Sequence, residues 1–190
     1  MNKPFEPEKY FSKHSEVAKK LDFSKITLIA DLIKKKVDSE NTIFTMGNGG
    51  SAHNASHFIT DWAKMSNIEK SIKLKGICLN DNIGLVTAYA NDIKFEEIYS
   101  SQLKVYLKDN DLVIVVSGSG NSQNIINALE YANDNNATTF AFLGYDGGKA
   151  ISIAQNHLLV PSFDMQICED IHLMAGHIIM KYLCDNQIKD

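Results

Sequence analysis

A loop of small and hydroxyl-bearing residues, Ser117-Gly118-Ser119-Gly120-Asn121-Ser122, has the composition of a binding site for a phosphate group. Its glycines let the backbone come close to a ligand and adopt positive φ. The helix expected after the loop offers unpaired amide donors, and the serine hydroxyls can donate to phosphate oxygens. A tight turn with a serine cap is the plainer alternative, but three serines and two glycines exceed what a turn requires. The loop predicts a site for a phosphorylated small molecule.

A second glycine-rich segment, Gly47-Asn48-Gly49-Gly50-Ser51, follows an earlier predicted strand. Glycines at such a place often mark only a sharp strand-to-helix turn. The segment lacks the lysine of a P-loop and does not fit the dinucleotide fingerprint, so no nucleotide cofactor is expected. We expect a sugar backbone to lie over these glycines. A later pair, Gly147-Gly148, is interpreted as a turn.

Four ionisable residues lie on two helices that the hydrophobic pattern predicts. His57 and Asp61 are four apart and share a helix face. Glu169 and His177 are eight apart, about 80° of rotation, so they could face one cavity from successive turns. Imidazole and carboxylate groups suit general acid–base catalysis, and the same four side chains could equally hold zinc or a similar divalent ion. The remaining alternative is a set of satisfied polar groups at a subunit interface.

The other histidines on or near these helices carry no functional prediction. His172 lies about 140° from His177 around the last helix, so the two are not expected to serve one site. His53 and His157 are interpreted as structural or surface residues.

Short apolar segments alternate with helical patterns and predict an α/β fold with a doubly wound, five-stranded parallel sheet flanked by helices. The predicted strands are 42–46, 74–79, 112–116, 138–143 and 157–160, and the predicted helices are 23–37, 52–65, 82–90, 95–107, a segment ending near 133, and 165–183. Asp22 or Ser24 would cap the helix at 23–37. Ligands of such sheets bind at the carboxyl ends of the strands, where the glycine- and serine-rich loops lie.

The 190 residues predict one domain, with N-terminal helices over about 1–38 and an α/β core over 39–190. A net charge of -4 gives no general reason to expect binding to nucleic acid or to a membrane. Cys78, Cys168 and Cys184 lie far apart in apolar segments, which indicates buried free thiols in a reducing cytoplasm. We expect no signal peptide and no membrane span, hence a cytoplasmic protein.

Several segments recur together in one known family. They are GNGGSAHNASHF at 47–58, AND at 90–92, SGSGNSQNIINAL at 117–129, and the closing helix with Glu169 and His177. In these segments the chain resembles phosphoheptose isomerases of the sugar isomerase (SIS) domain superfamily, which have a flavodoxin-like fold. The resemblance runs from about residue 23 to the end.

The resemblance implies an aldose–ketose isomerase that converts sedoheptulose 7-phosphate to D-glycero-D-manno-heptose 7-phosphate. That reaction begins heptose biosynthesis for lipopolysaccharide or capsule. The resemblance also implies a homotetramer with active sites at subunit interfaces and, as in some members, one bound zinc ion per subunit.

Residue roles are likewise carried over by position. Asp61 and His177 would be the acid–base pair, and His57 and Glu169 would complete a metal set with them. The implied substrate contacts are Asn48, Gly49, Gly50, Ser51, Asp61, Asn91, Asp92, Ser117, Gly118, Ser119, Ser122 and Glu169, of which Ser117, Gly118, Ser119 and Ser122 would bind the phosphate.

The chain departs from the family pattern at two positions of this set. The family usually has Glu where this chain has Asp61, and Gln where it has Glu169. The shorter Asp61 sets its carboxylate back from a substrate, and a second carboxylate at Glu169 should favour a divalent cation or raise one carboxyl pKa.

The resulting hypothesis is an isomerisation through a cis-enediol, with Asp61 and His177 moving protons on carbon and on oxygen. Two alternatives stay open. One is a non-catalytic SIS protein that binds a sugar phosphate or a replication-initiator protein. The other is an isomerase of another sugar phosphate.

Overall fold

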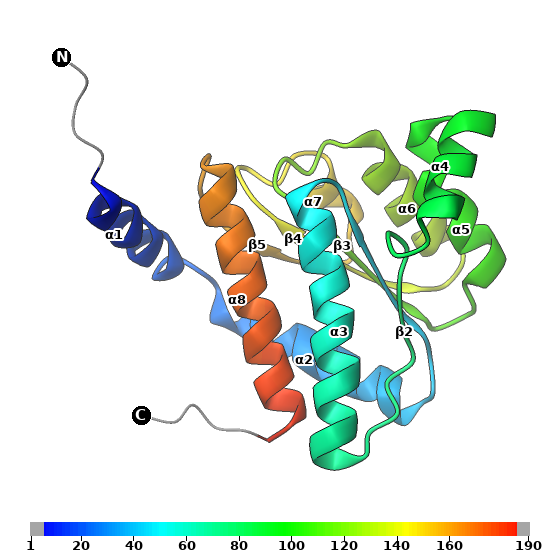
Figure 1. The fold of residues 1–190 in the computed structure, drawn as a ribbon, viewed down its shortest axis with the longest axis horizontal. Coiled ribbons are helices and arrows are strands. Elements are labelled where there is room, and N and C mark those ends of the chain that lie inside the picture. Colours follow the sequence, from blue (N-terminus) through cyan, green and yellow to red (C-terminus); the bar gives the residue numbers. More distant parts are fainter. Residues whose placement is uncertain (1–5, 186–190) are drawn as a thin grey trace.

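A computed structural model describes residues 6–185 of the chain as a parallel sheet between two layers of helices (Figure 1). The strands are β1 (Ile43–Gly47), β2 (Gly76–Cys78), β3 (Leu112–Ser117), β4 (Thr138–Leu143) and β5 (Asn156–Leu159). The helices are α1 (Pro7–Ala18), α2 (Phe23–Asp38), α3 (Gly50–Lys70), α4 (Ile83–Asp92), the 3₁₀ turn η1 (Phe95–Glu97), α5 (Ile98–Tyr106), α6 (Gln123–Asp134), α7 (Ala150–Ile153) and α8 (Met165–Leu183).

All strand pairs are parallel, in the order β2-β1-β3-β4-β5. This is the order of flavodoxin-like doubly wound sheets, and it confirms the predicted fold class. Because β1 and β3 are neighbours, with Gly47 opposite Val116, the loops that follow these two strands meet at one edge of the sheet.

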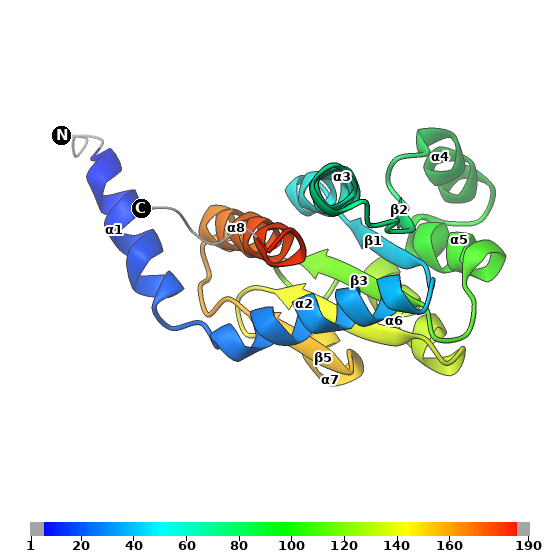
Figure 2. The ribbon, with the colours of Figure 1, turned by 90° about the horizontal axis from the view of Figure 1, so that it is seen from below.

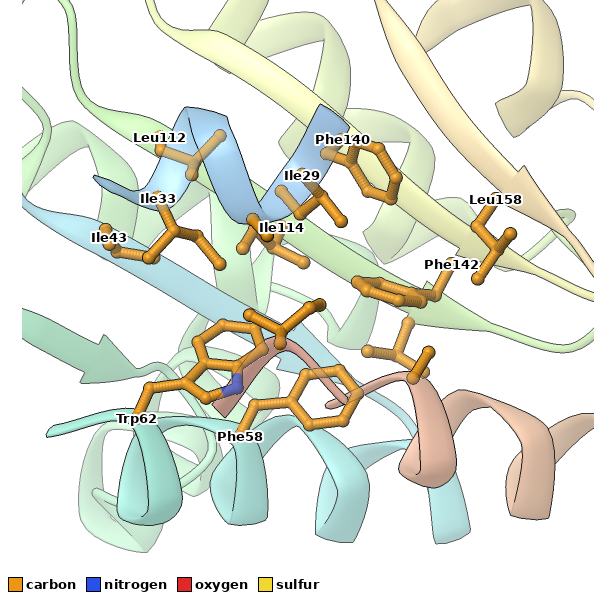
Figure 3. Packing of buried hydrophobic residues seen from close by; sticks show 14 of the residues in the cluster. Ile29, Ile33, Ile43, Phe58, Trp62, Leu112, Ile114, Phe140, Phe142 and Leu158 are labelled. Atoms are coloured by element: carbon orange, nitrogen blue, oxygen red, sulfur yellow. The ribbon is translucent and has the colours of Figure 1, made fainter. Parts of the chain in front are cut away.

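One face of the sheet is covered by α2, α3 and α8, whose apolar side chains form one core cluster with residues of the strands. In Figure 3, Phe58 and Trp62 of α3 point toward Ile114 and Phe142 of the sheet. The rings of Phe58 and Trp62 stack with their centroids 5.0 Å apart, and both side chains are fully buried. Burial of an aromatic side chain of this size contributes roughly 1.5–3 kcal/mol to stability, so this cluster fixes α3 on the sheet.

The other face is covered by α5, α6 and α7, which bury a second apolar cluster with the alternate residues of the strands. Helix α1 projects from the body of the molecule and contacts α8 (Figures 1 and 2). The Tyr10 hydroxyl of α1 donates to Asp170 Oδ2 of α8 at 2.6 Å. Across residues 6–185 no helix combines the length and apolarity that a bilayer crossing demands.

The predicted elements are confirmed, with differences at their ends. Helix α3 begins at Gly50 and runs to Lys70, longer than the predicted 52–65, because no glycine or proline interrupts the polar residues that follow Met65. The predicted helix 95–107 opens as the turn η1. The four residues of α7 are too few to show a helical period in sequence, so that helix was missed. Asp22 is the cap of α2 and accepts from Ser24 N at 3.1 Å.

Candidate functional site

A cavity of about 300 Å³ opens where the two glycine- and serine-rich loops meet. It is lined by Asn48, Gly49, Gly50, Ser51, Val116, Ser117, Gly118, Ser119, Ser122, Met165 and Glu169. Nine of these are residues that the sequence analysis proposed for substrate. Val116 and Met165 were missed, since an apolar strand end and an apolar helix start carry no chemical signal. The cavity lies at the carboxyl ends of β1 and β3, as expected for an open α/β sheet.

The loop after β3 is held in shape by its own serine side chains. Ser117 Oγ accepts a hydrogen bond from Gly120 N at 3.1 Å, and Ser119 Oγ accepts from Asn121 N at 3.3 Å. A hydroxyl that accepts from the backbone still has its own hydrogen to donate. The side chain of Ser122, the residue before α6, makes no capping bond to that helix. All three hydroxyls are therefore available to phosphate oxygens.

The segment Gly147-Gly148, interpreted as a turn, also supports this loop. Ala150 N donates to Gly120 O at 2.9 Å, which holds the two segments together. A Cβ at Gly120 would lie 2.0 Å from Gly147 O, and Gly120 itself has φ +61°. Only glycine tolerates this combination of close approach and positive φ. The loop after β3 is thus packed against the loop after β4, which limits its movement.

The loop after β1 is shaped by Gly49, with φ +57°, and by the Glu169 side chain. A Cβ at Gly50 would lie 2.4 Å from either carboxylate oxygen of Glu169, so that carboxylate lies against the first turn of α3. The positive end of the helix dipole favours a negative charge there. Asn54 Nδ2 of α3 also donates to the backbone oxygen of Glu169 at 2.8 Å, which fixes α8 relative to α3.

A second group of polar side chains lies further along the same two helices. His57 Nε2 is 3.1 Å from Asp61 Oδ2 and 3.0 Å from His177 Nε2, and His177 Nε2 is 3.6 Å from Asp61 Oδ2. The Asp61 side chain is 17% exposed, whereas both histidines are 44% exposed. An imidazole–carboxylate group that is open to solvent on one side can transfer protons to a bound molecule.

The approach of α3 to α8 explains why these side chains meet. Gly176 packs against Phe58 so closely that a Cβ there would lie 2.3 Å from the Phe58 ring. Trp62 Nε1 donates to Gly176 O at 2.9 Å. His177 follows Gly176 directly and His57 precedes Phe58, so the close contact of the helices brings the two imidazoles together. Figure 1 shows α3 and α8 side by side over the sheet.

These three residues fit a divalent metal ion. Their ligand atoms all lie within 4.8 Å of one another. A tetrahedral zinc ion with ligand distances of about 2.0–2.1 Å has ligand-to-ligand edges of roughly 3.3 Å, and the three observed separations of 3.0, 3.1 and 3.6 Å lie around that value. Two imidazoles and one carboxylate also form the donor set of catalytic zinc sites that keep a position open.

Glu169 departs from its expected place in the metal set. It lines the loop cavity against Gly50, and the metal-capable group of the described residues contains only His57, Asp61 and His177. The rotation of about 80° between Glu169 and His177 is compatible with one face, but eight residues also rise about 12 Å along a helix. The two side chains consequently belong to successive parts of the site.

The two remaining predicted sugar contacts, Asn91 and Asp92, form the end of α4. Both are exposed, and Asn91 Nδ2 donates to Asp92 Oδ1 at 2.8 Å. They are not among the residues that line the loop cavity, so their role remains a prediction.

The cysteines offer no activated nucleophile. All three are free and buried, as expected. Burial raises the pKa of the Cys78 thiol to about 11 and raises the pKa of the Cys168 thiol as well. A thiol with a raised pKa is protonated at neutral pH and reacts poorly. His172 faces the sheet, apart from His177, with Nε2 3.1 Å from Leu143 O.

The parallel sheet and the serine-rich loop at its edge define a class of sugar-phosphate-binding domain. The family model described as SIS domain matches residues 9–144. The phosphoheptose isomerase of Aquifex aeolicus is 34% identical over 177 residues, covering 90% of this chain and 91% of that protein. The phosphoheptose isomerase of Helicobacter pylori is 36% identical over 154 residues, covering 81% and 78%.

Solved structures agree with these relatives. A phosphoheptose isomerase from Neisseria gonorrhoeae superposes with a TM-score of 0.85 at 25% identity, covering 93% of this chain and 95% of that one. One from Francisella tularensis has a TM-score of 0.86 at 24% identity, covering 95% and 96%. The chain belongs to the phosphoheptose isomerase family of SIS-domain proteins.

Proposed function

We propose that the protein is an aldose–ketose isomerase that interconverts sedoheptulose 7-phosphate and D-glycero-D-manno-heptose 7-phosphate. One observation carries the proposal: the helices α3 and α8 both contribute to a cavity lined by donors suited to phosphate, and the same two helices carry the imidazole–carboxylate group. Phosphate recognition and proton transfer are the two tasks that this reaction requires. The name of the relatives, phosphoheptose isomerase, supports the choice of a heptose phosphate as the substrate.

The phosphate of the substrate is bound by the loop after β3. Ser117, Ser119 and Ser122 donate hydroxyl hydrogens, and the first amides of α6 add the partial positive charge of a helix start. The sugar then runs over Gly49 and Gly50 toward the polar group between α3 and α8.

Asp61 and His177 perform the proton transfers. The open-chain sugar has its carbonyl at C1 or C2, and one of the two groups removes the proton from the neighbouring carbon to give a cis-enediol. The same group then returns the proton to the former carbonyl carbon, so that no proton is gained or lost overall. The other group moves a proton between the two oxygens. The contacts of Asp61 to both imidazoles use Oδ2, which leaves Oδ1 to accept a proton.

We propose zinc as the metal, with His57, Asp61 and His177 as its ligands. An atom bound to zinc cannot also be a free base, so with zinc bound Asp61 Oδ1 would remain to accept a proton, and the roles of His177 as ligand and as acid–base group would be alternatives. A bound zinc ion would act as a Lewis acid toward the oxygens of the sugar. The donor set supports this assignment, since imidazole nitrogen and carboxylate oxygen are both common zinc ligands. Glu169, two helical turns away, instead limits how the sugar lies over Gly50.

We further propose a cytoplasmic homotetramer that serves heptose synthesis for lipopolysaccharide or capsule. Support for assembly comes from apolar side chains at the surface of α8. Met174, Ile178 and Tyr182, each four residues apart, are 45%, 39% and 42% exposed. Such a stripe on one helix face fits a subunit contact. Light scattering on the purified protein measures the mass directly, and a monomer would refute the assembly.

The activity is tested by incubating the protein with sedoheptulose 7-phosphate, with added zinc and after treatment with a chelator, and assaying the aldose product. We expect turnover that the chelator lowers and zinc restores. Absence of turnover under both conditions rejects the proposed reaction. Parallel assays with five- and six-carbon ketose phosphates then identify or exclude a different sugar phosphate.

A further inference from the structure

Behind the cavity, four buried or half-buried polar side chains connect the two ligand-binding loops. Asn48 comes from the loop after β1, Asn80 follows β2, Tyr99 lies in α5 and Asn124 lies in the first turn of α6. We call these four residues the loop-bridging network. Asn124 and Tyr99 are each 1% exposed, so their polar atoms need hydrogen-bond partners inside the protein.

The centre of the network is a reciprocal pair of amides. Asn48 Nδ2 donates to Asn124 Oδ1 at 2.9 Å, and Asn124 Nδ2 donates to Asn48 Oδ1 at 3.0 Å. The two residues are 76 positions apart in the chain. The pair therefore joins the glycine loop of β1 directly to the helix start that follows the phosphate-binding loop.

The other two members fix the Asn48 end of this pair. The Tyr99 hydroxyl is 3.1 Å from Asn48 Oδ1 and also contacts Gly47 O, and its single hydrogen serves one of these oxygens at a time. Asn80 donates to Gly47 O at 3.0 Å and accepts from Gly47 N at 3.2 Å. The backbone of Gly47 and the side chain of Asn48 thus have defined partners on both sides.

We infer that Asn124 is a positioning residue that sets the distance and orientation of the sugar-binding loop relative to the phosphate-binding loop. This inference rests on the proposed function, because only a ligand that contacts both loops depends on their relative placement. Inorganic phosphate needs the loop after β3 alone. A sugar phosphate contacts both loops, so its binding depends on the distance and orientation between them.

The test compares Asn124→Leu with Asn127→Leu. Leucine has the same number and branching of side-chain heavy atoms as asparagine but cannot make the amide pair. Asn127 lies one turn further along α6 and donates to Glu96 O and Glu97 Oε1 at 3.0 and 2.9 Å, away from both loops. It is a matched control for the loss of a half-buried asparagine from the same helix.

The first readout is amide hydrogen exchange of the free proteins. We expect faster exchange in residues 47–51 of Asn124→Leu, and wild-type exchange there in Asn127→Leu. The second readout is calorimetric binding. We expect Asn124→Leu to lose about tenfold in affinity for sedoheptulose 7-phosphate, which corresponds to one buried hydrogen-bonding group, while its affinity for inorganic phosphate stays within about twofold.

Unchanged exchange in residues 47–51 would overturn the inference, and so would an equal loss of affinity for both ligands. If Asn124→Leu does not fold, Tyr99→Phe replaces it, because that variant removes only the hydroxyl and should change both readouts in the same direction. The exchange experiment needs no substrate. A wild-type protein that neither binds nor converts sedoheptulose 7-phosphate would reject the proposed function, while the exchange result still decides the role of Asn124.

Discussion

Asp61 is the residue on which the proposed chemistry most depends. It is the least exposed member of the group with His57 and His177, and its Oδ2 lies within 3.6 Å of both imidazole nitrogens. The resemblance to phosphoheptose isomerases implied Glu, which is longer by one methylene, at this position. The structure compensates in part through the close packing of α3 and α8 at Gly176, which brings the two histidines to the shorter carboxylate.

We expect Asp61→Asn to lower kcat by about 100-fold or more, the usual contribution of a general acid or base. The amide keeps the size of the side chain but cannot accept a proton. Steady-state kinetics on the purified variant measure the effect. His53→Asn serves as the control, since His53 is an exposed residue of the same helix, and it should keep wild-type kcat. Retention of most activity in Asp61→Asn would show that the base lies elsewhere.

Gly50 is the residue that leaves room for Glu169. We expect Gly50→Ala to raise KM for the sugar phosphate, because its Cβ would displace a carboxylate that lies 2.4 Å away. If this contact is the cause, Gly50→Ala added to Glu169→Ala should raise KM no further than Glu169→Ala alone. Gly84→Ala is the control: its Cβ meets only Asn82 Oδ1, at 3.2 Å. An equal increase in KM in both glycine variants would contradict this explanation.

At the scale of elements, α3 and α8 form one unit that carries both parts of the site. The cavity end is fixed by Asn54 and Glu169, and the polar group is fixed by the contact of Gly176 with Phe58. The Trp62 side chain adds a hydrogen bond between the two helices. Any change in their spacing should therefore alter stability and the polar group together.

We expect Gly176→Ala to lower the free energy of unfolding by about 1–3 kcal/mol, the range for overpacking a well-packed core. The added methyl would lie 2.3 Å from the fully buried Phe58 ring. Thermal denaturation measures the loss, and zinc binding should weaken in the same variant. Adding Phe58→Leu makes room for the methyl group. A double variant whose loss of unfolding free energy equals the sum of the two single losses would argue against a direct clash.

The sequence predicted the elements well because their signals are local. The continuous apolar run of β3 and the helical period of α8 can both be recognised without knowledge of the fold. The Ser117–Ser122 loop is likewise defined by its own residues. The amide pair of Asn48 and Asn124 could not be predicted, since it depends on β1 and β3 being neighbours in the sheet. The spacing of Glu169 and His177 predicts one helix face from their rotation of about 80°, but the rise of about 12 Å along α8 places their side chains in different parts of the site.

At the scale of the whole molecule, His172 links stability to pH. Its side chain is fully buried, and its Nδ1 has no hydrogen-bond partner among the described residues. Desolvation lowers the pKa of His172 to about 4, although the contact with Leu143 O opposes this shift. Above pH 6.5 both the folded and the unfolded chain hold this histidine neutral. Between pH 6.5 and 4 the unfolded chain binds a proton that the folded chain does not.

The free energy of unfolding should therefore fall as the pH decreases from about 6.5 to 4, at up to roughly 1.4 kcal/mol per pH unit from this residue. Urea denaturation at several pH values measures the slope. We expect His172→Gln to reduce it, since glutamine can still donate to Leu143 O but does not titrate. His53→Gln, at an exposed position, should keep the wild-type slope. An identical slope in His172→Gln would assign the acid sensitivity to other groups.

The separation of Glu169 from His177 along α8 has a consequence for substrate choice. In the proposed function, the phosphate is held at the loop after β3 and the reacting carbon must reach His177, which follows the cavity residue Glu169 by about 12 Å along α8. The separation of the two parts of the site would therefore select sugar phosphates by the number of carbons in the sugar. A phosphosugar with fewer carbons could bind through the same phosphate site, but its carbonyl would lie farther from Asp61 and His177. Shorter sugar phosphates should consequently bind as competitors rather than react.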